Sequence, residues 1–101
     1  MNKRPTLNEI LDASSRIVGL TEEEVKSRGK KTKCNICRGL FYLTAWNFGY
    51  HPKMIAETVY RSRTSCIVTI NRYRGYAKFD RKIRELHNRI IERLNCNIDN
   101  G

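Results

Sequence analysis

The stretch RSRTSCIVTINRYRG, residues 61–75, decides how this chain folds. It contains four arginines and no acidic residue, and its centre is a run of four β-branched residues at positions 67–70. Such residues favour a strand, because a branched Cβ loses side-chain freedom in a helix. The alternative is a helix whose polar side faces a negatively charged partner. The sequence on either side decides between the two.

Helical patterns precede the stretch. Apolar residues recur every three or four positions in three segments that are predicted to be helices, 7–18, 34–46 and 51–59. Thr21 and Glu24 form the capping-box pattern that opens a further short helix, and residues 27–33 (SRGKKTK) are predicted to be a basic loop.

A final helical pattern follows the stretch, with Ile83, Ile90 and Leu94 on one stripe. A lone strand between helices would leave its backbone hydrogen bonds unmade. We therefore predict a turn at 60–62 and then a helix from about Thr64. Its core face would hold Cys66, Ile67, Ile70 and Tyr73. Its polar face would hold Ser65, Thr69 and Arg72.

The chain is predicted to be one small all-α helical bundle. It has 101 residues, 40% of them hydrophobic, which is enough for a single core over 1–101, with the ordered part at about 6–95. No apolar run approaches the length that crosses a bilayer, and the first residues lack the apolar stretch of a secretory signal. We therefore expect a cytoplasmic protein whose four cysteines are reduced.

The charge distribution predicts an anionic partner. The net charge is +10, and between Lys26 and Lys78 the only acidic residue is Glu57. A solvated face would intersperse both signs. A basic span of this length is typical of nucleic-acid binding and, less well, of binding to a membrane surface.

The order of elements is that of a helix-turn-helix: a short helix, a tight turn, and a second helix with polar residues at its start. In such a unit the second helix enters the major groove. Arginine pairs with guanine, serine and threonine bond several bases, and Val68 is placed to touch a thymine methyl group. The basic loop would hold phosphates or reach a minor groove.

Three segments carry a family resemblance: TEEEVKSRGKK, CRGLFYL and MIAETVYRSRTSCIVTINRYRG. Over about residues 7–95 the chain resembles the C-terminal DNA-binding domain of the bacterial replication initiator DnaA. The resemblance implies a helix-turn-helix bundle of the Trp-repressor-like kind that binds specific duplex DNA. It also implies a bacterial or phage-infected cell, and a role in replication initiation, its regulation, or transcription regulation.

The chain departs from the family pattern where bases would be read. Ile55 and Ala56 stand at the Ile-Gly-like pair of that family, but Ser62, Arg63 and Thr64 replace its arginine, aspartate and histidine. The family's target sequence is therefore not transferred. The initiator's ATPase domain is also missing, because Gly29-Lys30 lacks the spaced glycine of a phosphate loop.

The candidate DNA-binding residues combine the basic loop, the start of the long helix and the recognition helix. Lys30 falls at the loop arginine of the family, and Arg38 corresponds to a further DNA-contacting arginine when a one-residue gap follows it. The full set is Arg28, Lys30, Lys31, Lys33, Arg38, Arg61, Ser62, Arg63, Thr64, Ser65, Val68, Thr69 and Arg72.

Alternatives to this interpretation remain open. The basic surface also fits an RNA-binding module or one that binds an acidic protein. Cys34 and Cys37 have the spacing of a zinc or redox pair, but at i, i+3 on a helix they are predicted to be core residues without metal. Trp46 and Phe41 are predicted to be core and Tyr60 exposed. No paired carboxylates or activated nucleophile appear, so we expect neither enzymatic activity nor a cofactor.

The basic loop supports a first test. Replacing Lys30 and Lys31 together by alanine is expected to weaken binding to all duplexes by similar factors. The slope of log K against log salt should fall by up to about two units, one for each lost phosphate contact. A salt titration on preferred and scrambled duplexes measures this, and an unchanged slope in the folded double variant would contradict it.

Overall fold

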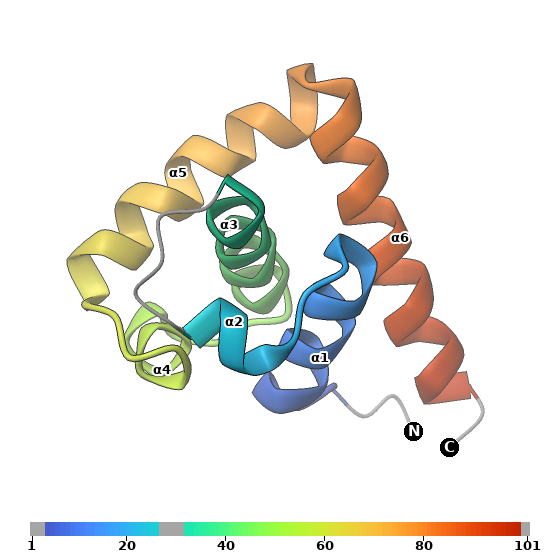
Figure 1. Cartoon of the computed structure of the whole chain (residues 1–101), viewed down its shortest axis with the longest axis horizontal. Coiled ribbons are helices and arrows are strands. Elements are labelled where there is room, and N and C mark those ends of the chain that lie inside the picture. The colour runs from blue at the N-terminus through green and yellow to red at the C-terminus, as the bar shows by residue number, and fades with distance from the viewer. Residues whose placement is uncertain (1–3, 27–31, 100–101) are drawn as a thin grey trace.

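The computed structural model describes residues 4–26 and 32–99, and these form six helices (Figure 1). They are α1 (Leu7–Val18), α2 (Glu22–Lys26), α3 (Thr32–Asn47), α4 (Pro52–Thr58), α5 (Arg63–Phe79) and α6 (Arg81–Asp99). No strand occurs within the described ranges, so the predicted all-α fold class is confirmed. The β-branched run at 67–70 lies inside α5, where packing outweighs a propensity worth about 1 kcal/mol.

The central element is α3, which packs against each of the other five helices. Figure 1 shows it nearly end-on, with the others arranged around it. Every residue from Cys37 to Ala45 is buried, so this helix is buried on all sides along its middle. Burying a side chain such as Phe41 contributes roughly 1.5–3 kcal/mol relative to exposure.

The helix ends follow local capping rules. The capping box predicted for α2 is confirmed: the Glu24 N–H donates to Thr21 Oγ1 at 3.1 Å, and the Thr21 N–H donates to Glu24 Oε1 at 3.1 Å. Thr6 and Glu9 form the same motif at the start of α1. Gly49, with a positive φ of 94°, reverses the chain after α3, a conformation in which a Cβ would be strained.

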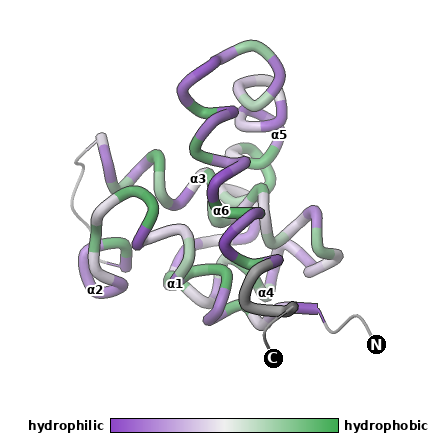
Figure 2. Tube along the Cα trace, turned by 90° about the vertical axis from the view of Figure 1, so that its right-hand side faces the viewer, coloured by the Kyte–Doolittle hydropathy of each residue, from purple (hydrophilic) through white to green (hydrophobic). Residues whose placement is uncertain are grey.

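One residue, Asp80, separates α5 from α6. Its N–H donates to the Tyr76 carbonyl at 2.7 Å, and its Oδ1 accepts from the Ile83 N–H at 3.1 Å, so it closes one helix and caps the next. In Figure 2 hydrophilic and hydrophobic residues alternate along α6. The predicted stripe of Ile83, Ile90 and Leu94 is buried, as expected.

The helices α3 and α5 approach each other closely at Gly39 of α3. A Cβ at this position would overlap the ring of Tyr73 from α5. The Tyr73 ring is itself 8% exposed, and its hydroxyl donates to the Asn35 carbonyl at 3.4 Å. The absence of a side chain at position 39 therefore lets the tyrosine lie on the backbone of the central helix.

Two core predictions were wrong. Trp46 is 38% exposed, because it lies in the last turn of α3 and one flank of its ring opens to solvent beside Pro52 and Asn71. Ile67 is 39% exposed, because it is rotated by about 100° from Cys66 on the helix and leaves the buried stripe. Phe41 is core, as predicted, and Tyr60 is 75% exposed, as predicted.

The predicted loop at 27–33 is also shorter than expected. Thr32 and Lys33 form the first turn of α3, where Lys33 is exposed, and residues 27–31 lie outside the described part of the chain.

The cysteine pair faces the core, as its helical spacing predicted. Cys34 is 2% exposed and Cys37 is fully buried. Burial, with a smaller contribution from Cys34, raises the pKa of Cys37 to about 12, and burial raises that of Cys66 to about 11. Within residues 4–26 and 32–99, no cluster of three histidine, cysteine or acidic side chains has metal-site geometry. No described helix has the length and apolar character needed to cross a bilayer.

Two helical glycines give a matched test of this packing. Gly39→Ala should lower the free energy of unfolding by about 1–3 kcal/mol, because the added methyl group displaces Tyr73. Gly75→Ala in α5 meets no atom within 4 Å and should raise it by about 0.5–1 kcal/mol. Urea unfolding of both variants measures the two signs, and stabilisation by Gly39→Ala would show that the ring moves without cost.

Candidate nucleic-acid interface

The short helix α4 precedes the interface. His51 caps its start, with Nδ1 accepting from the Lys53 N–H at 3.2 Å, and Pro52 takes the first helical position, where its missing N–H costs least. On the inner side Ile55 and Ala56 are buried, and α4 packs directly on α5. The short helix therefore sets the position of the first turns of α5.

The turn between α4 and α5 is tight and contains Tyr60 with a φ of 58°. The Tyr60 N–H donates to the Glu57 carbonyl at 3.2 Å, and the Arg61 N–H donates to the Ala56 carbonyl at 2.9 Å. This pair of bonds is the Schellman arrangement, whose left-handed position is usually glycine. A side chain there costs about 1–2 kcal/mol.

The turn also places two polar residues at the start of α5. The Ser62 Oγ caps the helix by accepting from the Ser65 N–H at 3.1 Å. Arg61 is half-buried, and its Nη1 donates to the Val59 carbonyl at 3.1 Å. The guanidinium is therefore held close to the turn.

The outward face of α5 carries Thr64, Val68 and Asn71. Their spacing of four and three residues places them on one stripe, and all three are exposed. Val68 is 50% exposed although it is apolar. α5 contains no acidic residue along its length. This face therefore presents a hydroxyl, a methyl-bearing surface and an amide beside positive charge.

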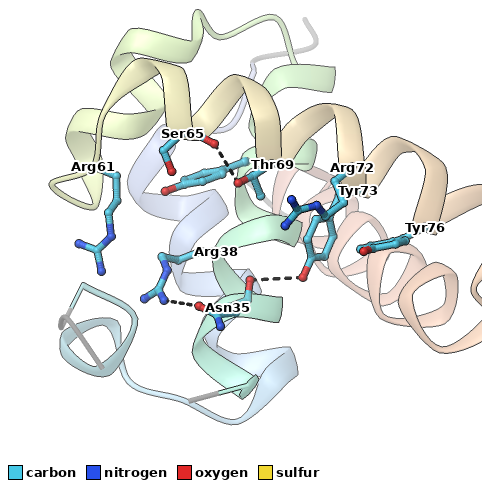
Figure 3. A pocket seen from close by; sticks show the side chains of 9 residues that line it. Asn35, Arg38, Arg61, Ser65, Thr69, Arg72, Tyr73 and Tyr76 are labelled. Atoms are coloured by element: carbon cyan, nitrogen blue, oxygen red, sulfur yellow. Dashed lines mark hydrogen bonds between the residues drawn. The ribbon is translucent and has the colours of Figure 1, made fainter. Parts of the chain in front are cut away.

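A groove runs along the next stripe of α5, against α3 (Figure 3). It has a volume of about 390 Å³. From α5 and the preceding turn it is lined by Arg61, Ser65, Thr69, Arg72, Tyr73 and Tyr76, and from α3 by Asn35, Arg38 and Tyr42. The described lining contains three arginines and no acid, so the groove attracts anions.

Arg38, predicted to contact DNA, is largely buried in the α3 side of this groove, with 9% exposed. Its Nη1 donates to the Val25 carbonyl at 2.8 Å and its Nη2 donates to Asn35 Oδ1 at 2.7 Å. The first bond satisfies a carbonyl near the C-terminal end of α2. Any contact of Arg38 with a nucleic acid has to be made inside the groove.

Two tyrosines of the groove, Tyr42 and Tyr73, have raised pKa values. Burial, then the neighbouring Cys66, raise the pKa of Tyr42 to about 12, against the opposing effect of Arg61 and Arg38. Burial, then Tyr76, raise the pKa of Tyr73. A neutral phenol can donate to an oxyanion, whereas a phenolate would repel it.

A second, more open hollow lies beside the turn. Lys53, Glu57, Arg61 and Arg63 line it, and its volume is about 340 Å³. Three of these lining residues are basic, and the fourth, Glu57, is the only acidic residue between Lys26 and Lys78. Among the described side chains, ion pairs join residues of α1 (Arg16 and Asp12) and of α6 (Arg81 and Glu85), both outside that span.

The candidate residues predicted from sequence separate into groups. The groove brings together Arg38, Arg61, Ser65, Thr69 and Arg72. The outward stripe holds Thr64 and Val68, the cap is Ser62, and Arg63 lines the second hollow. Lys33 lies apart, exposed at the start of α3. Arg28, Lys30 and Lys31 lie outside the described residues.

Sequence reasoning missed Asn71 and two of the three α3 residues that line the groove, Asn35 and Tyr42. Asn71 could have been found from its spacing of three residues from Val68 on a helix. Asn35 and Tyr42 carry no such signal, because they meet α5 only through the packing of two helices distant in sequence. No protein-family model and no curated protein matches the chain.

The strained turn provides a test of its own. Tyr60→Gly should raise the free energy of unfolding by about 0.5–1 kcal/mol, because glycine adopts a positive φ without the Cβ penalty but orders more backbone on folding. Tyr60→Ala keeps the penalty and should show no such gain. Urea unfolding separates the two variants, and equal destabilisation by both would mean that the ring stabilises the turn.

Proposed function

We propose that the protein binds double-stranded DNA in a sequence-specific manner, with α4 and α5 as a helix-turn-helix and α5 in the major groove. The outward stripe of α5 carries this proposal. The stripe is exposed and begins directly after the tight turn that follows the packed helix α4. The helix to which it belongs, α5, has basic residues and no acidic residue. A helix presented in this way matches the width of the B-DNA major groove.

The side chains of the stripe suit base edges. An asparagine amide such as that of Asn71 pairs with the two hydrogen-bonding groups of adenine in the major groove. Thr64 can donate to or accept from several bases, and the methyl groups of Val68 fit against a thymine methyl. Arg63, at the first turn, is placed to reach a guanine or a flanking phosphate.

The charge distribution supplies the non-specific part of binding. Lys33, Lys53 and Arg74 are exposed on three different helices, and the net charge of +10 attracts the duplex over distance. Phosphate contacts fix the orientation of the protein without reading sequence. The salt dependence of affinity then reports how many contacts are made.

The resemblance of three segments to the DNA-binding domain of the initiator DnaA supports a proposed role in replication initiation, its regulation, or transcription regulation. With that role we propose a location in the cytoplasm of a bacterial or phage-infected cell. The altered residues Ser62, Arg63 and Thr64 predict a target sequence different from that of the family.

Selection of bound duplexes from a random pool, followed by competition at fixed salt, tests the proposal. A preferred sequence bound at least about a thousandfold more tightly than random duplex is the expected result. Equal affinity for all duplexes would overturn it. Tighter binding to folded RNA or to an acidic protein would favour the alternative interaction module instead.

A single substitution in the outward stripe of α5 tests whether this stripe contacts the bases. Asn71→Ala should cost about 1–3 kcal/mol on the selected duplex and leave random-duplex affinity unchanged, because it removes a base contact and no charge. Asn88→Ala, an exposed asparagine on α6, is the matched control and should change neither. Equal losses on selected and random duplex after Asn71→Ala would place this stripe away from the bases.

A further inference from the structure

The groove between α3 and α5 has properties that base reading does not require. It lies on the stripe of Ser65, Thr69, Arg72 and Tyr76, one residue out of register with the outward stripe of Thr64, Val68 and Asn71. One residue corresponds to about 100° around a helix. The two surfaces therefore face different directions, and a ligand in the groove leaves the outward face open.

The groove is built for an oxyanion. Arg38 is fixed in it by hydrogen bonds to the Val25 carbonyl and to Asn35, so its orientation is set before a ligand arrives. Arg61 comes from the turn and Arg72 from α5, so the three arginines that line the groove come from three parts of the chain (Figure 3). Planar guanidinium groups pair with phosphate oxygens through two parallel bonds.

Neutral donors accompany the arginines. Tyr42 lines the groove, and burial raises the pKa of its hydroxyl to about 12, so it stays protonated at physiological pH, whereas the Tyr73 hydroxyl already donates to the Asn35 carbonyl. The hydroxyl of Ser65 is a further donor on the same side. Such hydroxyls complete the hydrogen bonding of a phosphate whose charge the arginines balance.

The size of the groove and its rim point beyond a bare phosphate. A volume of about 390 Å³ lies at the lower end of small-molecule sites, which span roughly 300–1,000 Å³. Tyr76 is 42% exposed, and its ring meets that of Tyr73 edge-on at 5.1 Å between centroids. The Tyr73 ring thus holds the Tyr76 ring in place, and the exposed part of the Tyr76 ring is available for stacking on a base.

We propose that this groove binds a nucleotide, with the phosphate between Arg38, Arg61 and Arg72 and the base against the ring of Tyr76. The inference does not depend on the proposed reading of duplex DNA. Two sources supply this chemistry: a free mononucleotide, or one nucleotide unit of a polynucleotide strand.

The test uses the full chain with three probes: adenosine monophosphate, inorganic phosphate and a short single-stranded oligothymidylate. Binding is followed by calorimetry and by the rise in melting temperature that a ligand of the folded state produces. Saturable binding of the mononucleotide, tighter than that of inorganic phosphate, is expected. Saturable binding of the oligonucleotide alone would assign the site to a strand.

Two variants and a matched control locate the site. Arg72→Gln removes an exposed charge from the groove and should weaken nucleotide binding at least about tenfold. Tyr76→Leu should weaken nucleotide binding and leave inorganic phosphate unaffected. Arg84→Gln removes one exposed charge from α6 and should leave all three affinities unchanged. Melting curves show that each variant folds.

The outcomes separate this inference from the proposed function. Equal weakening by Arg72→Gln and Arg84→Gln would reduce the groove to general electrostatics and overturn the inference, as would no binding of any probe. Asn71→Ala should leave mononucleotide affinity unchanged. Nucleotide binding without any preferred duplex would support the groove while contradicting specific DNA reading.

Discussion

The contact between Gly39 of α3 and the ring of Tyr73 of α5 is the constraint on which the interface depends. Because position 39 has no side chain, the tyrosine lies on the backbone of the central helix, and α5 packs across it at that point. The outward stripe of α5 then faces solvent, while the adjacent stripe faces α3 across the groove. A larger residue at position 39 would push the two helices apart and change both surfaces together.

Positive charge in this protein is positioned by burial as well as by exposure. Arg38 extends from a helix that is buried on all sides along its middle, yet its charged end lines the groove, where carbonyl and amide oxygens orient it. A buried arginine loses hydration, so an anionic partner stabilises its charge more than it would stabilise the charge of an exposed arginine. Exposed cations such as Lys33 and Lys53 retain their water and contribute mainly through long-range attraction.

The turn before α5 keeps a tyrosine where the backbone favours glycine. The Schellman bonds after α4 require a left-handed residue, and Tyr60 occupies that position at a cost in stability. The ring contributes little burial in return, since Tyr60 is 75% exposed, and the Lys26 ammonium lies 5.9 Å from the centre of the ring. Strain of this kind gathers at binding sites. It lies here beside Arg61, which lines both the groove and the second hollow.

The sequence by itself determined the helices, because periodicity and capping act within a few residues: the capping box at Thr21, the stripe of α6, and the helical state of residues 67–70 could all be derived from neighbours. It also located the basic span and grouped Ser65, Thr69 and Arg72 on one face of α5, but it did not single out the outward stripe of Thr64, Val68 and Asn71. Only the tertiary structure decided that Trp46 and Ile67 are partly exposed and that Arg38 is buried. It alone also decided that the polar face of α5 lines a groove whose other wall is α3. The groove residues in question are Ser65, Thr69 and Arg72 from α5 and Asn35 and Tyr42 from α3. The physical reason is that a helical pattern specifies which residues share a face, whereas what that face meets depends on how separate helices pack against one another.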